Sequence, residues 1–137
     1  MVRPTASAPL PSTTKVLSVG LDPRVLDYSR LPAGIDEEAF TARIEAAHTA
    51  LREAGFDVRS CLIGTAADDA EAAVREALRA DTFGLAMIGG GVRMMPEHTV
   101  LFERLVNLLV EEAPGIRLCF NSAPENTVET LRRWIGV

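Results

Sequence analysis

The amino-acid sequence predicts an α/β domain in which a four-stranded parallel sheet lies between two layers of helices, as a three-layer α/β/α sandwich. Three observations favour this class. Apolar β-type runs alternate with helical patterns, Gly, Pro and Asp separate them, and 137 residues suit one domain, expected over residues 15–137. Because strands that alternate with helices are joined by right-handed crossovers, the sheet is expected to be parallel. A mean hydropathy of +0.14 and a charged fraction of 24% fit a folded chain.

An arm, a strand and a long loop are expected first. Residues 1–14 are rich in Pro, Ser, Thr and Ala without an apolar run, so we expect a flexible arm. Lys15–Leu21 is apolar with β-branched residues, which predicts a strand that ends at the Asp22-Pro23 break. The connection over residues 23–35 is longer than most βα loops, and such loops are often functional or mobile.

The first helix and the second strand follow this loop. Asp36 can cap a helix whose apolar positions recur at helical spacing, and Gly55 lies where a left-handed stop residue is expected. Asp57–Ile63 alternates weakly in polarity and predicts the second strand. A second helix is expected over residues 68–79, with acidic residues early and arginines late, as the helix dipole favours.

The second half of the chain repeats this alternation. Its expected elements are a strand over residues 83–88, a helix over 96–112, a strand over 116–120 and a helix that ends near residue 134. The first of these strands is apolar without alternation, which is typical of a strand covered on both faces. Ser122 and Glu125 match the capping box S-x-x-E, so they predict the start of the last helix.

The expected strand order is 2-1-3-4, because it places the two most apolar strands in the centre of the sheet. The strand over residues 116–120 is then expected at an edge, where unprotected backbone groups pair with other strands. We therefore expect a homodimer joined at this edge or through the last helix. Trp134 is the candidate anchor of the dimer, with an ordinary core position as the alternative.

A ligand site is expected at the carboxyl ends of the strands, because open parallel sheets bind ligands where the winding direction reverses. With this strand order the reversal lies between the first and third strands, and Gly89, Gly90 and Gly91 directly follow the third. Consecutive glycines can take positive φ and present N–H groups to an anion, and Arg93 could clamp a phosphate or carboxylate. The alternative is that the glycines only permit a tight turn under a packed helix.

Four further residues near this point are candidate site residues. Asp22 could orient a ligand or close the Asp-Pro turn, and Asn121 could bind a ligand or serve in a turn. Ser122 could contact the ligand or act as a nucleophile, although its spacing favours a helix N-cap. His98 is the candidate catalytic acid–base, should a reaction take place.

Metal and cofactor chemistry has little support in the residue pattern. Glu45 and His48 form a single E-x-x-H spacing, whereas a di-iron bundle uses two, so no metal site is predicted and the cofactor is left unassigned. His48 itself is expected to be a partly buried helix residue. Met94 and Met95 could line an apolar pocket or a partner surface, or pack within the loop.

Charge and cysteine usage narrow the partners and the compartment. The net charge of −5 and a pI near 5.0 argue against nucleic acid and against an anionic membrane surface. No run approaches the ~20 apolar residues of a membrane span. Cys61 and Cys119 lie in apolar runs outside any CxxC pair, as expected of reduced core residues in a cytoplasmic protein. Lys15 is the only lysine among 14 basic residues, which is typical of a GC-rich bacterial genome.

The element order resembles flavodoxin-like and receiver-like α/β domains over about Lys15–Trp134, at the level of topology. The segments GGGVRMMPEH and CFNSAPENT resemble the pattern of a bacterial family of short flavodoxin-like, Rossmann-like proteins. This resemblance implies the fold and no activity. A receiver would carry a phosphate-accepting Asp where Gly89 ends the third strand, and the G-x-G-x-x-G, P-loop and G-x-S-x-G motifs do not occur.

Two functions are expected from these features. The first is binding of an anionic or polar small molecule, with glycine N–H groups and Arg93 on its charge and with Asp22 and Asn121 for orientation. The alternative is a non-catalytic dimeric interaction module. Its surface would be the edge strand, Trp134 and the long loop after the first strand.

Overall fold

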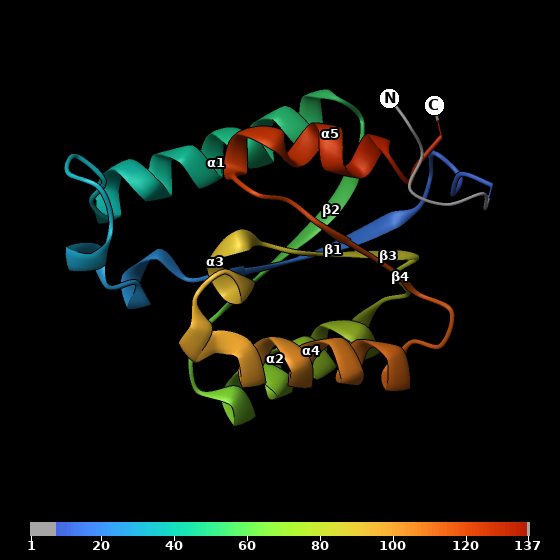
Figure 1. The fold of residues 1–137 in the computed structure, drawn as a ribbon. Helices are drawn as coiled ribbons and strands as arrows, with labels where there is room; N and C mark the ends of the chain where they lie inside the picture. The colour runs from blue at the N-terminus through green and yellow to red at the C-terminus, as the bar shows by residue number, and fades with distance from the viewer. Residues whose placement is uncertain (1–7, 137) are drawn as a thin grey trace.

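The computed structural model describes residues 8–136 and contains a four-stranded parallel sheet with the order β2-β1-β3-β4 (Figure 1). The strands are β1 (Lys15–Leu21), β2 (Asp57–Ile63), β3 (Leu85–Ile88) and β4 (Arg117–Phe120). The helices are α1 (Glu37–Glu53), α2 (Ala67–Ala80), α3 (Gly90–Arg93), α4 (Thr99–Glu112) and α5 (Thr127–Arg132), with 3-10 turns η1 (Pro23–Val25), η2 (Tyr28–Arg30), η3 (Pro96–His98) and η4 (Pro124–Asn126). The predicted fold class and strand order are confirmed.

Two layers of helices cover the sheet. α1 and α5 lie against one face, and α2 and α4 lie against the other (Figure 1). Alternate residues of β1 face opposite layers, so Leu17 and Val19 pack in the cluster under α2 and α4, whereas Val16 packs with Leu51 of α1. The two central strands are the most buried, as their apolar sequences predict.

The predicted end signals of α1 are confirmed. Asp36 is the N-cap, and its Oδ1 accepts a hydrogen bond from the N–H of Ala39 at 2.8 Å. Gly55 follows the helix with φ +87°, a left-handed conformation that costs little only for glycine. These local signals need no tertiary contact, which explains why the sequence pattern predicts both ends of this helix.

The start of the last helix differs from the predicted capping box. η4 precedes α5, and Asn126 Oδ1 accepts a hydrogen bond from the N–H of Ser122 at 3.2 Å. Glu125 forms a bidentate ion pair with Arg43 of α1, at 2.6 and 2.8 Å. The S-x-x-E interpretation is therefore wrong, because Glu125 is drawn to a cation on another helix and not to its local backbone.

The segment before β1 is bonded to the last residues of the chain. The N–H of Leu10 donates to the carbonyl of Trp134 at 2.7 Å, and the N–H of Gly136 donates to the carbonyl of Leu10 at 2.8 Å. Leu10 and Ile135 therefore lie side by side, as a parallel bridge. Figure 1 shows the start of β1 close to the end of α5. The first half of the predicted arm, residues 1–7, lies outside the described residues. Between residues 8 and 136, no helix combines the length and the apolar character that a membrane span requires.

Both cysteines are free thiols, as predicted. Cys119 is buried and Cys61 is half-buried. Burial raises the pKa of the Cys119 thiol to about 12, and burial also raises the pKa of Cys61. Neither thiol is activated as a nucleophile, which fits the predicted role as small apolar core residues.

Candidate functional site

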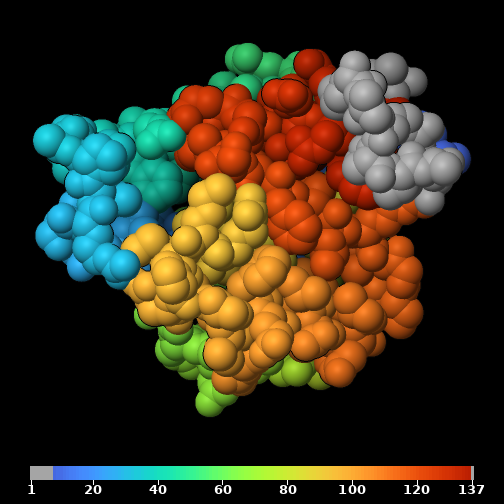
Figure 2. Space-filling model, in the orientation of Figure 1, coloured from blue at the N-terminus to red at the C-terminus, as the bar shows by residue number. Residues whose placement is uncertain are grey.

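A cavity of about 280 Å³ lies at the carboxyl ends of the strands, on the face of the sheet that α1 covers. Its floor is the sheet, its roof is α1, and its walls are the loop after β1, α3 and the segment after β4. In Figure 2 the loop after β1 (blue to cyan) and α3 (yellow) lie on either side of a hollow in the surface. Large apolar side chains dominate the lining: Leu21, Leu26, Leu31, Ile35, Phe40, Ile44, Leu62, Met87, Met94 and Met95.

Small side chains on two neighbouring strands create this space. The β1 residues that face α1 are Val16, Ser18 and Gly20, so side-chain volume falls toward the carboxyl end of the strand. In the parallel register Val58 lies beside Val16, and Ser60 lies beside Ser18. The valine pair fills the space under α1, whereas the serine pair and Gly20 leave it open.

The roof comes from one face of α1. Phe40, Ile44, Ala47 and His48 follow helical spacing and all line the cavity. Burial lowers the pKa of the His48 imidazole from its ordinary value of 6.5, and the positive charge of Arg52 lowers it further. The ring is therefore neutral at pH 7, with one donor and one acceptor nitrogen.

The long loop after β1 closes one side of the cavity. It places Leu26, Leu31 and Ile35 on the lining, although the loop is otherwise polar. An ion pair between Arg30 of η2 and Glu97 of η3 joins this loop to the segment after α3. The loop that the sequence marks as unusually long is therefore part of the site.

Asp22 serves the turn at the start of this loop. Its carboxylate accepts a hydrogen bond from the N–H of Arg24 at 2.9 Å and pairs with the Arg24 guanidinium at 2.7 Å. The hydrogen bonds from Arg24 lower the pKa of Asp22. Asp22 is not among the residues that line the cavity within the described chain, so the structure places it in the Asp-Pro turn.

The three consecutive glycines form one wall, but in an unexpected conformation. Gly89 has φ −71° and is the N-cap of α3, which Gly90 and Gly91 begin. None of the three is among the described glycines with positive φ. The expectation of positive φ at these glycines is therefore wrong, and their predicted contact with a ligand stays a prediction. The N–H of Gly89 donates to the Val19 carbonyl at 2.9 Å, and this bond continues β3 beside β1 into the helix.

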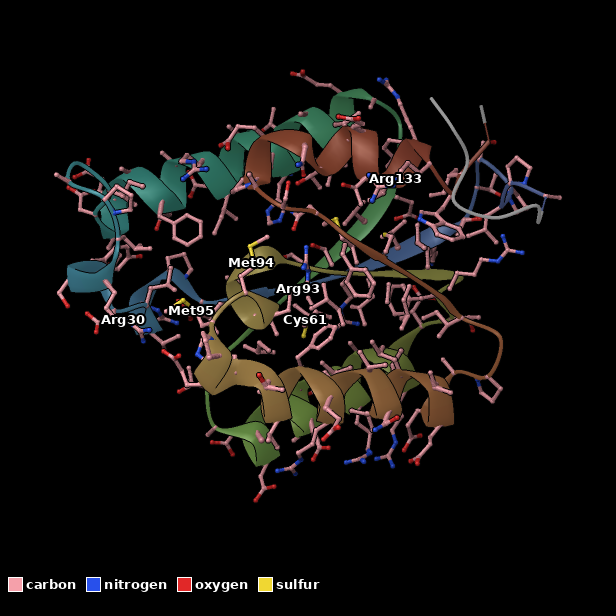
Figure 3. The ribbon with its side chains drawn as sticks, viewed as in Figure 1. Arg30, Cys61, Arg93, Met94, Met95 and Arg133 are labelled. Atoms are coloured by element: carbon pink, nitrogen blue, oxygen red, sulfur yellow. The ribbon has the colours of Figure 1, made fainter. Side chains whose placement is uncertain are left out.

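Two methionines at the end of α3 face the cavity from this wall. Figure 3 shows Met94 projecting from α3 toward α1, and Met95 lying against the loop after β1. Met94 is 53% exposed, so it lies at the rim. The pocket-lining interpretation of both residues is confirmed, and their flexible side chains suit an adaptable apolar surface.

Asn121 joins two walls of the cavity. This residue is 7% exposed, and its Oδ1 accepts a hydrogen bond from the N–H of Gly90 at 3.1 Å. Its Nδ2 donates to Thr127 Oγ1 at 3.1 Å. Asn121 lines the cavity as predicted by its position, yet both ends of its amide already bind protein groups.

Arg93 turns away from the cavity. Figure 3 shows its side chain extending from α3 toward β4. Its Nη2 donates to the Asn121 carbonyl at 2.7 Å, and its guanidinium lies 5.4 Å from the centre of the Phe120 ring. Arg93 is outside the lining of this cavity, so the structure does not place it as a counter-charge there.

The two remaining predicted residues, Ser122 and His98, differ in their position relative to the cavity. Ser122 lines the cavity, and its hydroxyl accepts a hydrogen bond from Asn126. His98 lies outside the lining, and its Nδ1 contacts the carbonyl of Gly91 at 3.1 Å. The one cationic side chain in the lining is Arg43, which is already bound by Glu125 in bidentate geometry.

The residues that sequence reasoning missed are those that require the register between strands. Ser18, Ser60 and His48 are unremarkable one by one, and only the aligned strands and the overlying α1 bring them to one cavity. One signal was present in the sequence. Side-chain volume decreases along the alternate positions Val16, Ser18 and Gly20. This decrease indicates a hollow on one face of the strand.

No protein-family model and no curated protein matches the chain. Within residues 8–136, no group of three or more His, Cys, Asp and Glu side chains is arranged to hold a metal ion. The candidate site is therefore defined by its own geometry. It is a mainly apolar cavity at the predicted reversal of the sheet, with a few polar groups on its floor and roof.

Proposed function

We propose that the protein binds a small molecule with an apolar body and one polar group in the cavity at the carboxyl ends of the strands. The single observation that carries this proposal is the cavity of about 280 Å³. Ligand sites are typically concave, mainly apolar and equipped with a few placed polar groups. The cavity opens at the surface beside the loop after β1 and α3, so a small molecule can enter it from solvent (Figure 2).

The lining favours a polar ligand over a strongly anionic one. Arg43 is neutralised by Glu125, and Arg93 binds the Asn121 carbonyl outside the cavity. A buried anion without a paired cation costs far more free energy than a neutral hydrogen-bonding group. Of the two ligand classes expected from the sequence, the polar one therefore has the stronger support.

Filling the floor tests the proposal. Gly20 lies in β1 beneath α1, and a Cβ at this position meets only Leu62 Cδ2, at 3.9 Å. Gly20→Val projects a β-branched side chain into the cavity from a strand position that suits valine. We expect this variant to bind cumene (isopropylbenzene) at least tenfold more weakly than the wild type, measured by ¹⁵N NMR titration.

Gly64→Val is the matched control. A Cβ at Gly64 has no neighbour within 4 Å, and Gly64 is outside the cavity lining. This variant should bind cumene as the wild type does. Absence of saturable binding by the wild type of both cumene and its polar analogue benzamide, or equal cumene binding by Gly20→Val with its fold retained, would contradict the proposal.

A further inference from the structure

One part of the cavity floor carries a pair of serine hydroxyls, from the buried Ser18 of β1 and from the exposed Ser60 of the edge strand β2. Ser18 and Ser60 are direct neighbours in the β1–β2 register, and both face α1. Ser18 is 7% exposed, and its hydroxyl has no hydrogen-bond partner among residues 8–136. The Ser18 oxygen is not among the fully buried side-chain atoms of these residues that lack a partner, so the hydroxyl faces the open space of the cavity. A group bound in the cavity can therefore hydrogen-bond to it.

His48 approaches the same part of the cavity from the roof. Leu51 of α1 packs in the same cluster as Val16 and Val58, one residue pair below the serines. α1 returns antiparallel to β1 (Figure 1), and His48 precedes Leu51 by about one helical turn. The three residues from Leu51 back to His48 advance about 4.5 Å along α1, and two strand residues advance about 6.6 Å, so His48 lies near the level of the serine pair.

The hydrogen-bonding groups in this part of the cavity are uncharged. Serine hydroxyls donate and accept, and a neutral imidazole offers one donor and one acceptor nitrogen. No hydrogen bond within the described part of the chain uses the His48 ring or the Ser60 hydroxyl. Arg43, the cation of the lining, is bound to Glu125 of η4.

We propose that Ser18, Ser60 and His48 form the subsite for an uncharged head group of the ligand, a primary amide or an alcohol. This inference rests on the proposed function, since it assigns the orientation of a molecule in the same cavity. The head group lies at the serine pair, and the apolar body extends past Gly20 toward the methionines of α3. The subsite thereby selects ligands by the uncharged donor and acceptor atoms of the head.

Three probes of similar shape test the head-group specificity. Benzamide carries an uncharged amide, benzoate carries a carboxylate, and cumene replaces the two polar atoms by methyl groups. For the wild type at pH 7.5 we expect benzamide to bind at least tenfold more tightly than benzoate. Ser18→Ala and His48→Phe should each lower the ratio of benzamide affinity to cumene affinity about two- to tenfold, the range of one lost hydrogen bond.

Ser12→Ala is the matched control, because Ser12 is exposed and lies outside the cavity. It should leave the affinities for all three probes unchanged. Equal changes in benzamide and cumene affinity on Ser18→Ala and His48→Phe would overturn the subsite, as would tighter binding of benzoate than of benzamide. Cumene binding that is lost in Gly20→Val would then still support the cavity as a binding site. If neither cumene nor benzamide binds the wild type, both proposals fail together.

Discussion

Asn121 shows how one side chain can be close to a ligand site and still be occupied by the protein. Its amide accepts from the N–H of Gly90 and donates to Thr127, so it connects the segment after β3 to the start of α5. Both partners sit at the cavity wall, and Asn121 itself is buried. The role of Asn121 is to hold the walls at a fixed spacing.

Removing this amide is expected to destabilise the fold. Asn121→Ala leaves the N–H of Gly90 and the hydroxyl of Thr127 with fewer partners in a buried place, which costs about 1–3 kcal/mol. Urea unfolding followed by circular dichroism measures this loss. Asn107→Ala on the exposed side of α4 is the control, with an expected change within about 0.5 kcal/mol. An equal effect of the two substitutions would contradict the tie between the walls.

Among the helices and strands, α3 is the element that its own local sequence does not favour. Gly is a poor helix former, yet Gly90 and Gly91 begin this helix. Two tertiary bonds hold its start, one from the N–H of Gly89 to the Val19 carbonyl and one from the N–H of Gly90 to Asn121. The helix thus depends on β1 and on Asn121, which follows β4, more than on its own residues.

Because α3 has ordinary helical geometry, an alanine inside it should stabilise the protein. A Cβ on Gly91 meets Leu21 Cβ at 3.5 Å, an ordinary contact, and φ there is not positive. Gly91→Ala reduces the freedom of the unfolded chain, so we expect a gain of about 0.4–1 kcal/mol in urea unfolding.

Gly55→Ala is the opposite case and serves as the comparison. Its φ of +87° is strained for any residue with a Cβ, so this variant should lose stability. A loss on Gly91→Ala comparable with the loss on Gly55→Ala would show that the glycines are needed for a left-handed turn after all.

The difference between local sequence signals and contacts between distant residues explains which elements the sequence could predict. The bounds of β1 and β2 and the ends of α1 depend on local signals, namely apolar runs, an Asp N-cap and a Gly stop. α3 and the late start of α5 depend on Asn121 and on the Arg43–Glu125 ion pair, whose partners are far apart in sequence. The position of the site could be predicted from the strand order. The serine pair on its floor could be identified only from the register between β1 and β2.

At the scale of the whole molecule, the predicted edge position of β4 is confirmed, and the homodimer stays a prediction. The Phe120 carbonyl in this strand already accepts a hydrogen bond from Arg133 Nη2 at 3.1 Å. A side chain that occupies an edge carbonyl hinders the addition of another strand. Both predicted dimer surfaces, the β4 edge and the last helix with the half-buried Trp134, stay predictions, with one carbonyl of the edge already occupied.

The stability of the protein varies with pH because of His48, which lines the cavity, and because of several carboxyl groups that accept hydrogen bonds. Burial lowers the pKa of His48, so between pH 6.5 and that lowered value the unfolded chain binds more protons than the folded one. Stability therefore falls as the pH falls through this window.

Five carboxyl groups also have lowered pKa values, because each accepts a hydrogen bond from a neighbouring side chain. The pairs of carboxyl group and donor are Asp22 with Arg24, Asp27 with Ser29, Asp81 with Lys15, Glu97 with Arg30, and Glu125 with Arg43. Their stabilisation is lost in a second window, as the pH falls below about 4.

The substitution His48→Phe separates these two windows. It removes the titrating imidazole, so the decline in unfolding free energy that the wild type shows below pH 6.5 should disappear, and the decline below about pH 4 should remain. Urea unfolding at pH values from 8 to 3 measures both curves, and ¹H NMR titration of the His48 ring gives its midpoint directly. A midpoint at or above 6.5 would mean that the ring is hydrated and is not buried between α1 and the sheet. In that case the imidazole points away from the serine pair, and the polar part of the cavity loses one of its hydrogen-bonding groups.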